Sequence, residues 1–493
     1  PTIIAEGSWV LYWAFWVGVI TQFFINTELQ RWAIATGESI FQGFDRLNRA
    51  WPLFFLVFGF FQIGWPGWAA TGSEVFAAWT GIVPRADWWI IGVISMAVIW
   101  LTYQAGPLVY NIVEDLQIVM MIVAVAVAVT LMVLLNTFGQ LANVPAGAVN
   151  FGALPTDADF DIATFLGGLA YAGAGGYTNL AQGVWAREKG YGMGSYQGRV
   201  KNPLRGGGDT EELHSGYTFE PTEKNMNRWK AWWRTTQQEH FLTFVVGVMV
   251  VATIVMTIAA QYAGGGEFGG DGVTMWLDTI IPALGGTSAW LMYALLFIAL
   301  FSTQYAQIEV FVRNSGDIVY QQFGRERGWN MSYIFFGLLT VFTLWGMAII
   351  GFRVAQPWMI HGWATRKPMI ILVIGAAAAG VMMWPYNALT VVLNTTRLPE
   401  HLQPGWTRIV AMWWATAFFG FFSILLIGET LATRFGLEAF SVTIGIVGSG
   451  TGGYALWAFA LLVQLYTMVR SGKAKVEASG TVENAEEAKG FLP

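Results

Sequence analysis

The sequence contains no cysteine, so disulfide bonds, thiolate metal sites and cysteine nucleophiles are all excluded. Only four histidines occur, at scattered positions, and none belongs to the H-E-x-x-H pattern of a zinc enzyme. Charge is also scarce: 12% of the residues are charged, against about 25% in an ordinary soluble domain. This composition excludes an ordinary soluble globular protein, and the net charge of −5 gives no reason to expect a nucleic acid partner.

Apolar residues take the place of the missing charge. They make up 55% of the chain, and the run LQIVMMIVAVAVAVTLMVLL (116–135) has the roughly 20 residues that cross a bilayer. Such windows predict eleven membrane-spanning helices, at about 8–28, 51–71, 88–104, 116–136, 162–186, 240–262, 288–311, 331–351, 368–392, 407–427 and 442–468. We therefore predict an all-α polytopic membrane protein in the lipid bilayer, with a transmembrane domain over 1–470 and a disordered polar tail over 471–493.

The basic residues are distributed unevenly between the two sides of the predicted membrane. If the first residue lies outside, 21 of the 26 lysines and arginines fall in inner segments. Because inner loops carry the excess of positive charge, we predict a protein of the cell membrane whose C-terminus is cytoplasmic. The longest inner segment, 187–239, is rich in glycine without a period or a phosphate-binding pattern, so we predict a flexible cytoplasmic loop there.

One predicted span contains residues that destabilise a helix. In GGLAYAGAGGYTNLAQG (167–183), Gly173 and Gly176 are followed at once by Tyr177, Thr178 and Asn179. Glycines can let a second helix pack closely, but close packing does not account for the polar residues that follow. We predict a broken helix at 173–179, since membrane helices are unwound only where the backbone faces protein or a water-filled cavity. In transporters such breaks form half of a substrate site.

Other polar residues in apolar spans add candidates, because buried polar groups in membranes are often functional. Gln304 and Gln307 lie one turn apart in the middle of a span and are expected to line a pathway. Glu309 and Arg313, four residues apart, are expected to form an ion pair within one helix. Glu74 is either a pathway residue or an interfacial one.

A proline interrupts a later span. In GVMMWPYNALTVVLN, Pro385 removes a backbone donor and is expected to kink the helix, and Asn387 supplies a polar group beside the kink. Packing alone also explains many such kinks, so Asn387 is a weaker candidate than the residues at 173–179.

The order of these pieces resembles the Nramp (natural resistance-associated macrophage protein) family of divalent-metal transporters. GWAATGSEVFAA is similar to that family's third-span pattern A-T-D-L-A-E, and FIALFSTQYAQIEVFVRNSGD and GVMMWPYNALTVVLNTTRLP resemble its eighth and tenth spans. The resemblance covers roughly residues 8–427. It implies an inverted-repeat, leucine-transporter-type fold in which AGAGGYTNLAQGVWARE is the sixth span. On this alignment the first helix of the fold, which carries D-P-G-N in the family, is missing from the sequence.

The predicted break departs from the family pattern. Where the family has M-P-H-N-L, this sequence has Gly176, Tyr177, Thr178, Asn179 and Leu180, so the soft methionine ligand is absent. The resemblance leaves Thr178 and Asn179 as metal ligands. Oxygen donors suit a hard ion such as magnesium, whereas the family's own pattern favours manganese or iron.

Three functions follow from the sequence. The first is a proton-coupled secondary transporter of a divalent metal ion, with no bound cofactor and no enzymatic activity. The second keeps the fold but transports a small organic solute, coupled to sodium ions or protons. The third is a non-transporting sensor or a membrane enzyme, which the absence of a larger soluble domain and of acid–base pairs disfavours.

Overall fold

The computed structural model describes residues 4–5, 8–105, 109–153, 162–198, 200–201, 215–268, 271–352, 368–444 and 446–477, and every regular element in these ranges is a helix. The α-helices are α2 (Tyr12–Thr36), α3 (Ile40–Leu47), α4 (Ala50–Ile63), α5 (Gly67–Thr80), α6 (Trp88–Thr102), α7 (Val109–Leu134), α8 (Val144–Val149), α9 (Ile162–Tyr171), α10 (Tyr177–Glu188), α11 (Glu223–His240), α12 (Gly247–Ala263), α13 (Ile281–Leu284), α14 (Gly286–Val319), α15 (Met331–Gly351), α16 (Pro368–Thr396), α17 (Trp406–Arg434) and α18 (Thr451–Glu477). Wide π-helical turns follow α11 and α14 and precede α13, at Phe241–Val246, Tyr320–Gly324 and Thr274–Ile280.

The predicted membrane spans are present, but the last one begins at Thr451 and not at residue 442. Ten helical stretches of the described residues are long and apolar enough to cross a membrane. The remaining predicted span, 162–186, is formed by two shorter helices, α9 and α10. The chain is therefore a multi-pass helical membrane protein.

The span predicted at 51–71 is wrong in detail. It is the pair α4 and α5, which extends to Thr80 and is interrupted at Gly64, Trp65 and Pro66. Pro66 has no backbone N–H to donate, so one hydrogen bond of a continuous helix is lost at this point. The carbonyl of Pro66 accepts the amide of Ala70 at 2.9 Å, and α5 starts again from there.

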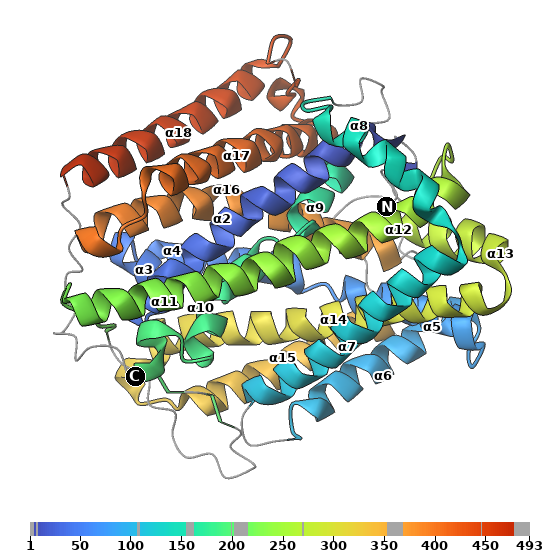
Figure 1. Cartoon of the computed structure of the whole chain (residues 1–493), viewed down its shortest axis with the longest axis horizontal. Helices are drawn as coiled ribbons and strands as arrows, with labels where there is room; N and C mark the ends of the chain where they lie inside the picture. Colours follow the sequence, from blue (N-terminus) through green and yellow to red (C-terminus); the bar gives the residue numbers. More distant parts are fainter. Residues whose placement is uncertain are drawn as a thin grey trace.

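Two groups of helices pack around the broken helix (Figure 1). In one, α5, α6, α14 and α15 contact one another. In the other, α16 contacts α9, α17 and α18, while α2 contacts both α10 and α17. Helix α14 also contacts α10, so it links the first group to the broken helix.

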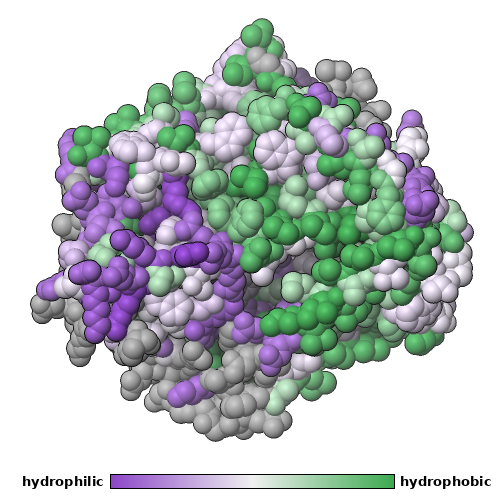
Figure 2. Space-filling model, in the orientation of Figure 1, coloured by the Kyte–Doolittle hydropathy of each residue, from purple (hydrophilic) through white to green (hydrophobic). Residues whose placement is uncertain are grey.

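The charged residues lie at the two ends of these helices. We call the end carrying Arg31, Arg46, Arg187, Arg397 and Arg408 the basic end. Its members are tied together across the fold: the guanidinium of Arg31 donates to the carbonyl of Leu402 at 3.0 Å, and that of Arg397 to the carbonyl of Arg46 at 2.9 Å. Figure 2 shows hydrophilic side chains gathered where α11 begins and hydrophobic side chains over α7 and α12.

Two segments that the sequence placed in loops are helical. Residues 223–239 of the predicted loop 187–239 belong to α11, whose first turn is capped by the Thr222 side chain accepting from the amide of Asn225. Residues 471–477 of the predicted tail continue α18, with Lys473 and Glu477 paired at 3.6 Å one turn apart. The rest of the tail lies outside the described residues.

Candidate functional site

The helix predicted to be broken is non-helical from Ala172 to Gly176, between the end of α9 and the start of α10. Gly175 and Gly176 have φ values of +62° and +57°, a conformation that suits glycine because it has no Cβ. A Cβ on Gly176 would lie 2.1 Å from Gln62 Oε1 and 2.7 Å from Ala379 Cα. These two glycines are therefore required both by the backbone conformation and by close packing. Tyr177, Thr178 and Asn179, which the prediction included in the break, form the first turn of α10.

Two buried glutamines bind the backbone groups that the break leaves free. Gln62, in the last turn of α4, accepts the amide of Tyr177 at 2.6 Å and donates to the carbonyl of Gly175 at 3.3 Å. Gln22 of α2 accepts the amide of Gly175 at 3.2 Å and donates to two carbonyls at the end of α9, each at 2.9 Å. Because unpaired backbone groups are costly in a membrane, these contacts stabilise the break.

The sequence analysis did not select either glutamine. Each lies within a largely apolar run, VGVITQFFIN for Gln22 and FGFFQIGW for Gln62. Isolated polar residues in spans are a signal of function or of buried hydrogen bonding. That signal was available, but the partners lie more than 100 residues away in the sequence.

Gly173 lies beside the same glutamine. A Cβ there would be 2.3 Å from Gln22 Oε1 and 2.4 Å from the ring carbon Cζ of Phe244. At this position the small residue allows close approach, which was the alternative explanation for the glycines.

The first turn of α10 contacts α14. The hydroxyl of Thr178 donates to Gln307 Oε1 at 3.1 Å, and the amide of Asn314 donates to the carbonyl of Tyr177 at 2.8 Å. Asn179 is fully buried, its Nδ2 lies 3.5 Å from Gln22 Oε1, and its Oδ1 has no hydrogen-bond partner among the described residues. The structure thus brings together Tyr177, Thr178, Asn179 and Gln307, and leaves one buried amide oxygen unused.

The break between α4 and α5 lies next to the break between α9 and α10. Gln304 of α14 accepts the amide of Ala69 at 3.1 Å, and the indole of Trp345 donates to the carbonyl of Gly64 at 2.8 Å. A cavity of about 10 Å³ lies between the two breaks, lined by Gln62, Trp65, Tyr171, Gln304 and Gln307 among others. This is about the volume that holds one water molecule. The pair of glutamines predicted to line a pathway therefore lies between two helix breaks.

Asn387 is not brought to this site. It is buried in α16, and its Nδ2 donates to the carbonyl of Ala415 in α17 at 3.4 Å. Asn387 is one of the eight residues proposed from the sequence. Its polar contact joins α16 to α17 and does not involve the helices at the break.

The two carboxylates considered in the sequence analysis are both paired. Glu309 and Arg313 form the predicted ion pair one turn apart on α14, which is confirmed. Glu74 is paired with Arg85 at 2.8 Å, at the end of the molecule opposite the basic end. Neither carboxylate faces the break.

The donor set at the break is uncharged. In the described ranges there is no group of three or more histidine, aspartate or glutamate side chains that could hold a metal ion. The side chains around the break are hydroxyls and amides, which offer hard oxygen ligands of low charge. Such a set can bind an ion that keeps part of its water shell, or a solute with hydrogen-bonding groups.

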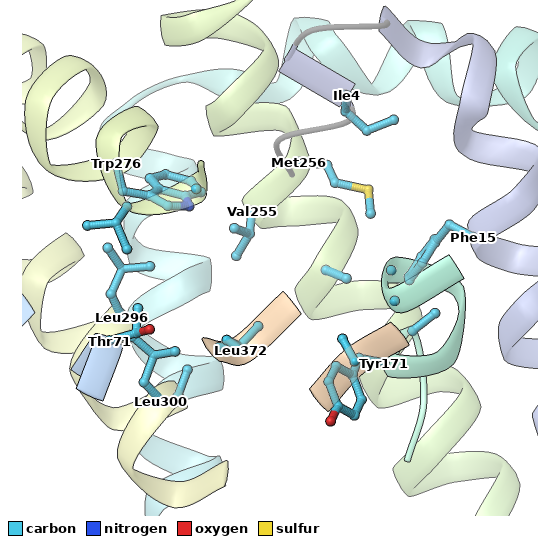
Figure 3. Close-up of a pocket in the computed structure, with 18 of the residues that line it drawn as sticks. Ile4, Phe15, Thr71, Tyr171, Val255, Met256, Trp276, Leu296, Leu300 and Leu372 are labelled. Atoms are coloured by element: carbon cyan, nitrogen blue, oxygen red, sulfur yellow. The ribbon is translucent and has the colours of Figure 1, made fainter. Parts of the chain in front are cut away.

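A larger chamber lies on the α9 side of the break (Figure 3). It has a volume of about 480 Å³ and is lined by residues of α2, α5, α9, α12, α14 and α16. Most labelled side chains that surround it are apolar, including Phe15, Met256, Leu296 and Leu300. The hydroxyl of Thr71, also in its wall, is buried and has no hydrogen-bond partner.

Discontinuous helices that meet at a polar centre within a membrane domain are typical of transporters. No protein-family model matches the chain, and no curated protein matches it in sequence.

Solved structures do resemble it. A crystal structure of the Eremococcus coleocola manganese transporter, in complex with an aromatic bis-isothiourea substituted compound, has a TM-score of 0.61 at 10% identity and covers 97% of this chain and 90% of its own. Crystal structures of two single-substitution mutants of that transporter match with TM-scores of 0.61 and 0.60 at 10% and 9% identity, with the same coverage of both chains. At this identity the likeness establishes the fold alone, and the leucine-transporter-type fold expected from the sequence is confirmed.

Proposed function

We propose that the chain is a secondary active transporter that moves a divalent metal ion across the cell membrane. The break at 172–176 forms half of the ion site, and the basic end faces the cytoplasm. Transport is driven by an ion gradient, and the Nramp resemblance implies a gradient of protons. The observation that carries this proposal is the buried, unpartnered Oδ1 of Asn179 at the start of a discontinuous helix.

The local electrostatics support a cation. Helix α9 ends at the break with its backbone carbonyls, two of which accept hydrogen bonds from Gln22, and the negative end of a helix dipole attracts positive charge. Asn179 Oδ1, the Thr178 hydroxyl and Gln307 Oε1 add side-chain oxygens on the α10 side. These ligands would act together with the carbonyls, as in other transporters with broken helices.

The donor set favours a hard ion that stays partly hydrated. The break contributes neither a thioether nor an imidazole, so the site lacks the ligands that favour softer metals. Magnesium dehydrates reluctantly and commonly keeps several waters, so a few neutral oxygens are a suitable environment. We therefore expect Mg²⁺ to be transported in preference to Mn²⁺.

Uptake into liposomes tests this function. Purified protein in liposomes should take up Mg²⁺ saturably under an inward proton gradient, and Asn179→Ala and Thr178→Ala should each reduce uptake about tenfold or more, as expected for one lost oxygen contact worth about 1.4 kcal/mol. Thr433→Ala is a matched control, because its hydroxyl bonds only to the carbonyl of Glu429 on an exposed turn of α17. Undiminished uptake in both site variants would contradict the proposed site.

A small organic solute is the second candidate. The apolar chamber of about 480 Å³ beside the break favours it, since binding sites for organic ligands have volumes of about 300–1,000 Å³ and mostly apolar walls. If folded protein takes up neither Mg²⁺ nor Mn²⁺, uptake of labelled amino acids and amines under a sodium gradient becomes the decisive measurement.

A further inference from the structure

Five charged side chains are buried together where α10 and α14 reach the basic end. Arg187 and Glu188 end α10, and Glu309, Arg313 and Asp317 lie on α14; each is at most 3% exposed. We call these five residues the inner charge cluster. Arg313 pairs with Glu309 on its own helix and lies 2.9 Å from Glu188, while Arg187 lies 3.3 Å from Asp317.

The inner charge cluster has unequal numbers of the two signs. Two arginines face three carboxylates, which leaves one negative charge in excess if all five are ionised. Burying an uncompensated charge is strongly unfavourable, so an excess of this kind calls for a further positive charge.

Among the residues that the structure describes, the neighbouring charges do not supply it. Lys189 follows Glu188, but its amine pairs with Glu114 at 3.2 Å and with Glu239 at 2.5 Å. Glu38, on the connection between α2 and α3, pairs with Arg46 of α3, so that pair is neutral.

The remaining groups around the cluster are polar or paired elsewhere. The Ser39 hydroxyl donates to Asp317 at 2.5 Å and the Trp185 indole donates to Glu309 at 2.8 Å. Another buried group, Glu28 with Arg31 and Arg408, has one positive charge in excess, but its contacts run to α16 and to the Leu402 carbonyl.

Glu188 is the least satisfied carboxylate of the cluster. Glu309 accepts hydrogen bonds from Trp185 and Arg313, and Asp317 accepts from Ser39 and Arg187. Within the described part of the chain, neither carboxyl oxygen of Glu188 accepts a hydrogen bond, although the side chain is buried and its Oε1 lies 2.9 Å from Arg313 Nη1. The contact with Arg313 is thus an ion pair without the alignment of a hydrogen bond.

We propose that the inner charge cluster binds one monovalent cation at Glu188, a proton or a sodium ion, and that this is the coupling ion of transport. The proposal rests on the proposed function. A proton would form an O–H bond on one carboxyl oxygen of Glu188, and a sodium ion would be held by its carboxyl oxygens. Either cation removes the excess negative charge, and no other bond is made or broken.

The position of Glu188 explains how such an ion could act on the substrate site. Helix α10 has 12 residues, so Glu188 lies about 16 Å along the helix axis from Tyr177 at the break. Helix α14 carries both the cluster and Gln307, which contacts Thr178. Binding or release of the ion changes how α10 is held on α14, and both helices extend to the break.

The experiment measures ion flux beside substrate flux. Protein in liposomes is given Mg²⁺, and luminal pH is followed with a trapped dye while ²²Na⁺ uptake is measured in parallel. Wild-type protein should move protons or sodium ions together with Mg²⁺; the flux that appears identifies the ion. In Glu188→Gln the ion flux should fall at least tenfold while downhill Mg²⁺ uptake changes less than threefold. Glu188→Asp, which keeps the charge, should retain coupling, and Glu326→Gln, on an exposed turn after α14, should match wild type.

A second readout does not depend on transport. If Glu188 holds a proton in the folded protein, raising the pH should lower the unfolding midpoint in detergent, and this response should be smaller in Glu188→Gln. If it holds sodium, added Na⁺ should raise the midpoint of wild type but not of the variant. Unchanged ion flux in Glu188→Gln, or midpoints whose responses to pH and Na⁺ equal those of wild type, would overturn the proposal. Folded wild-type protein could take up no Mg²⁺ while its unfolding midpoint still responds to pH or Na⁺ more strongly than that of Glu188→Gln. That result would contradict the proposed function but not the cation site at Glu188.

Discussion

The two sides of the broken helix differ in what surrounds them. On the α9 side lies a chamber of about 480 Å³ with mostly apolar walls, where the Thr71 hydroxyl has no partner. On the α10 side, five charged side chains are packed together and are almost fully buried. Binding in an apolar chamber depends on the size and polarity of the ligand. The stability of a buried charge cluster depends instead on pH, on bound ions and on whether each charge keeps its partner. One discontinuous helix is thus placed between two environments that are governed by different forces.

The largest effect is expected from removing a charge on the α10 side. Arg313→Met leaves Glu188 and Glu309 buried without their arginine, and breaking a buried ion pair in this way costs about 3–5 kcal/mol. Equilibrium unfolding in mixed detergent measures the change in free energy. Arg327→Met, on an exposed turn, is the control and should stay within about 0.5 kcal/mol of wild type. Equal effects of the two substitutions would remove the contrast between cluster and surface.

The break itself should be the next most sensitive region. Gly176→Ala places a Cβ 2.7 Å from the backbone of Ala379 at a φ of +57°, and is expected to lower the free energy of unfolding by about 1–3 kcal/mol. In Gly337→Ala, within α15, the new methyl meets nothing within 4 Å, and a gain of up to about 1 kcal/mol is expected. The same unfolding assay compares the two, and a stable Gly176→Ala protein would show that the backbone at the break is not fixed.

A substitution on the chamber side should be tolerated. Thr71→Val removes a buried hydroxyl that has no partner and keeps the side-chain shape, so the free energy of unfolding should change by less than about 1 kcal/mol and tend to rise. A decrease in the free energy of unfolding of more than about 1 kcal/mol would show that the Thr71 hydroxyl makes a polar contact. The chamber side would then be less apolar than its lining residues indicate.

The smallest effect concerns a residue of the basic end outside the spans. Burial lowers the pKa of the His401 imidazole, against the opposing influence of its hydrogen bond to the carbonyl of Phe219 at 3.1 Å. The unfolded chain therefore binds the proton first, so this contribution to stability is present above about pH 6.5 and is lost as the pH falls below it. The unfolding midpoint should drop less between pH 8 and pH 6 in His401→Gln than in wild type. A larger drop in the variant would reverse the assigned direction.

Local sequence patterns sufficed for the spans and for the place of the main break. The apolar run at 116–135 predicts a span by its length alone. The glycines before Tyr177 predict the break, because Gly175 and Gly176 adopt positive φ values. Both signals come from residues that are close together in the sequence. The pairing of Glu309 with Arg313 was accessible for the same reason, since the two residues are one turn apart.

The contacts that complete the site could not be predicted in this way. Gln62 meets Tyr177 and Gln22 meets Gly175 only after helices separated by more than 100 residues have packed, and helix packing fixes which face of each span turns inward. The break at Pro66 was missed because apolar windows measure composition and not hydrogen bonding. Asn387, in contrast, has a polar sequence environment but faces α17.

Magnesium binding to the purified protein tests the central claim most directly. Isothermal titration of the wild type should show one saturable site per chain, and Asn179→Ala should weaken it at least about tenfold, because one direct oxygen contact is worth about 1.4 kcal/mol. Thr433→Ala should bind as the wild type does. Equal affinity of wild type and Asn179→Ala, or no binding by folded wild type, would contradict a metal site at the break.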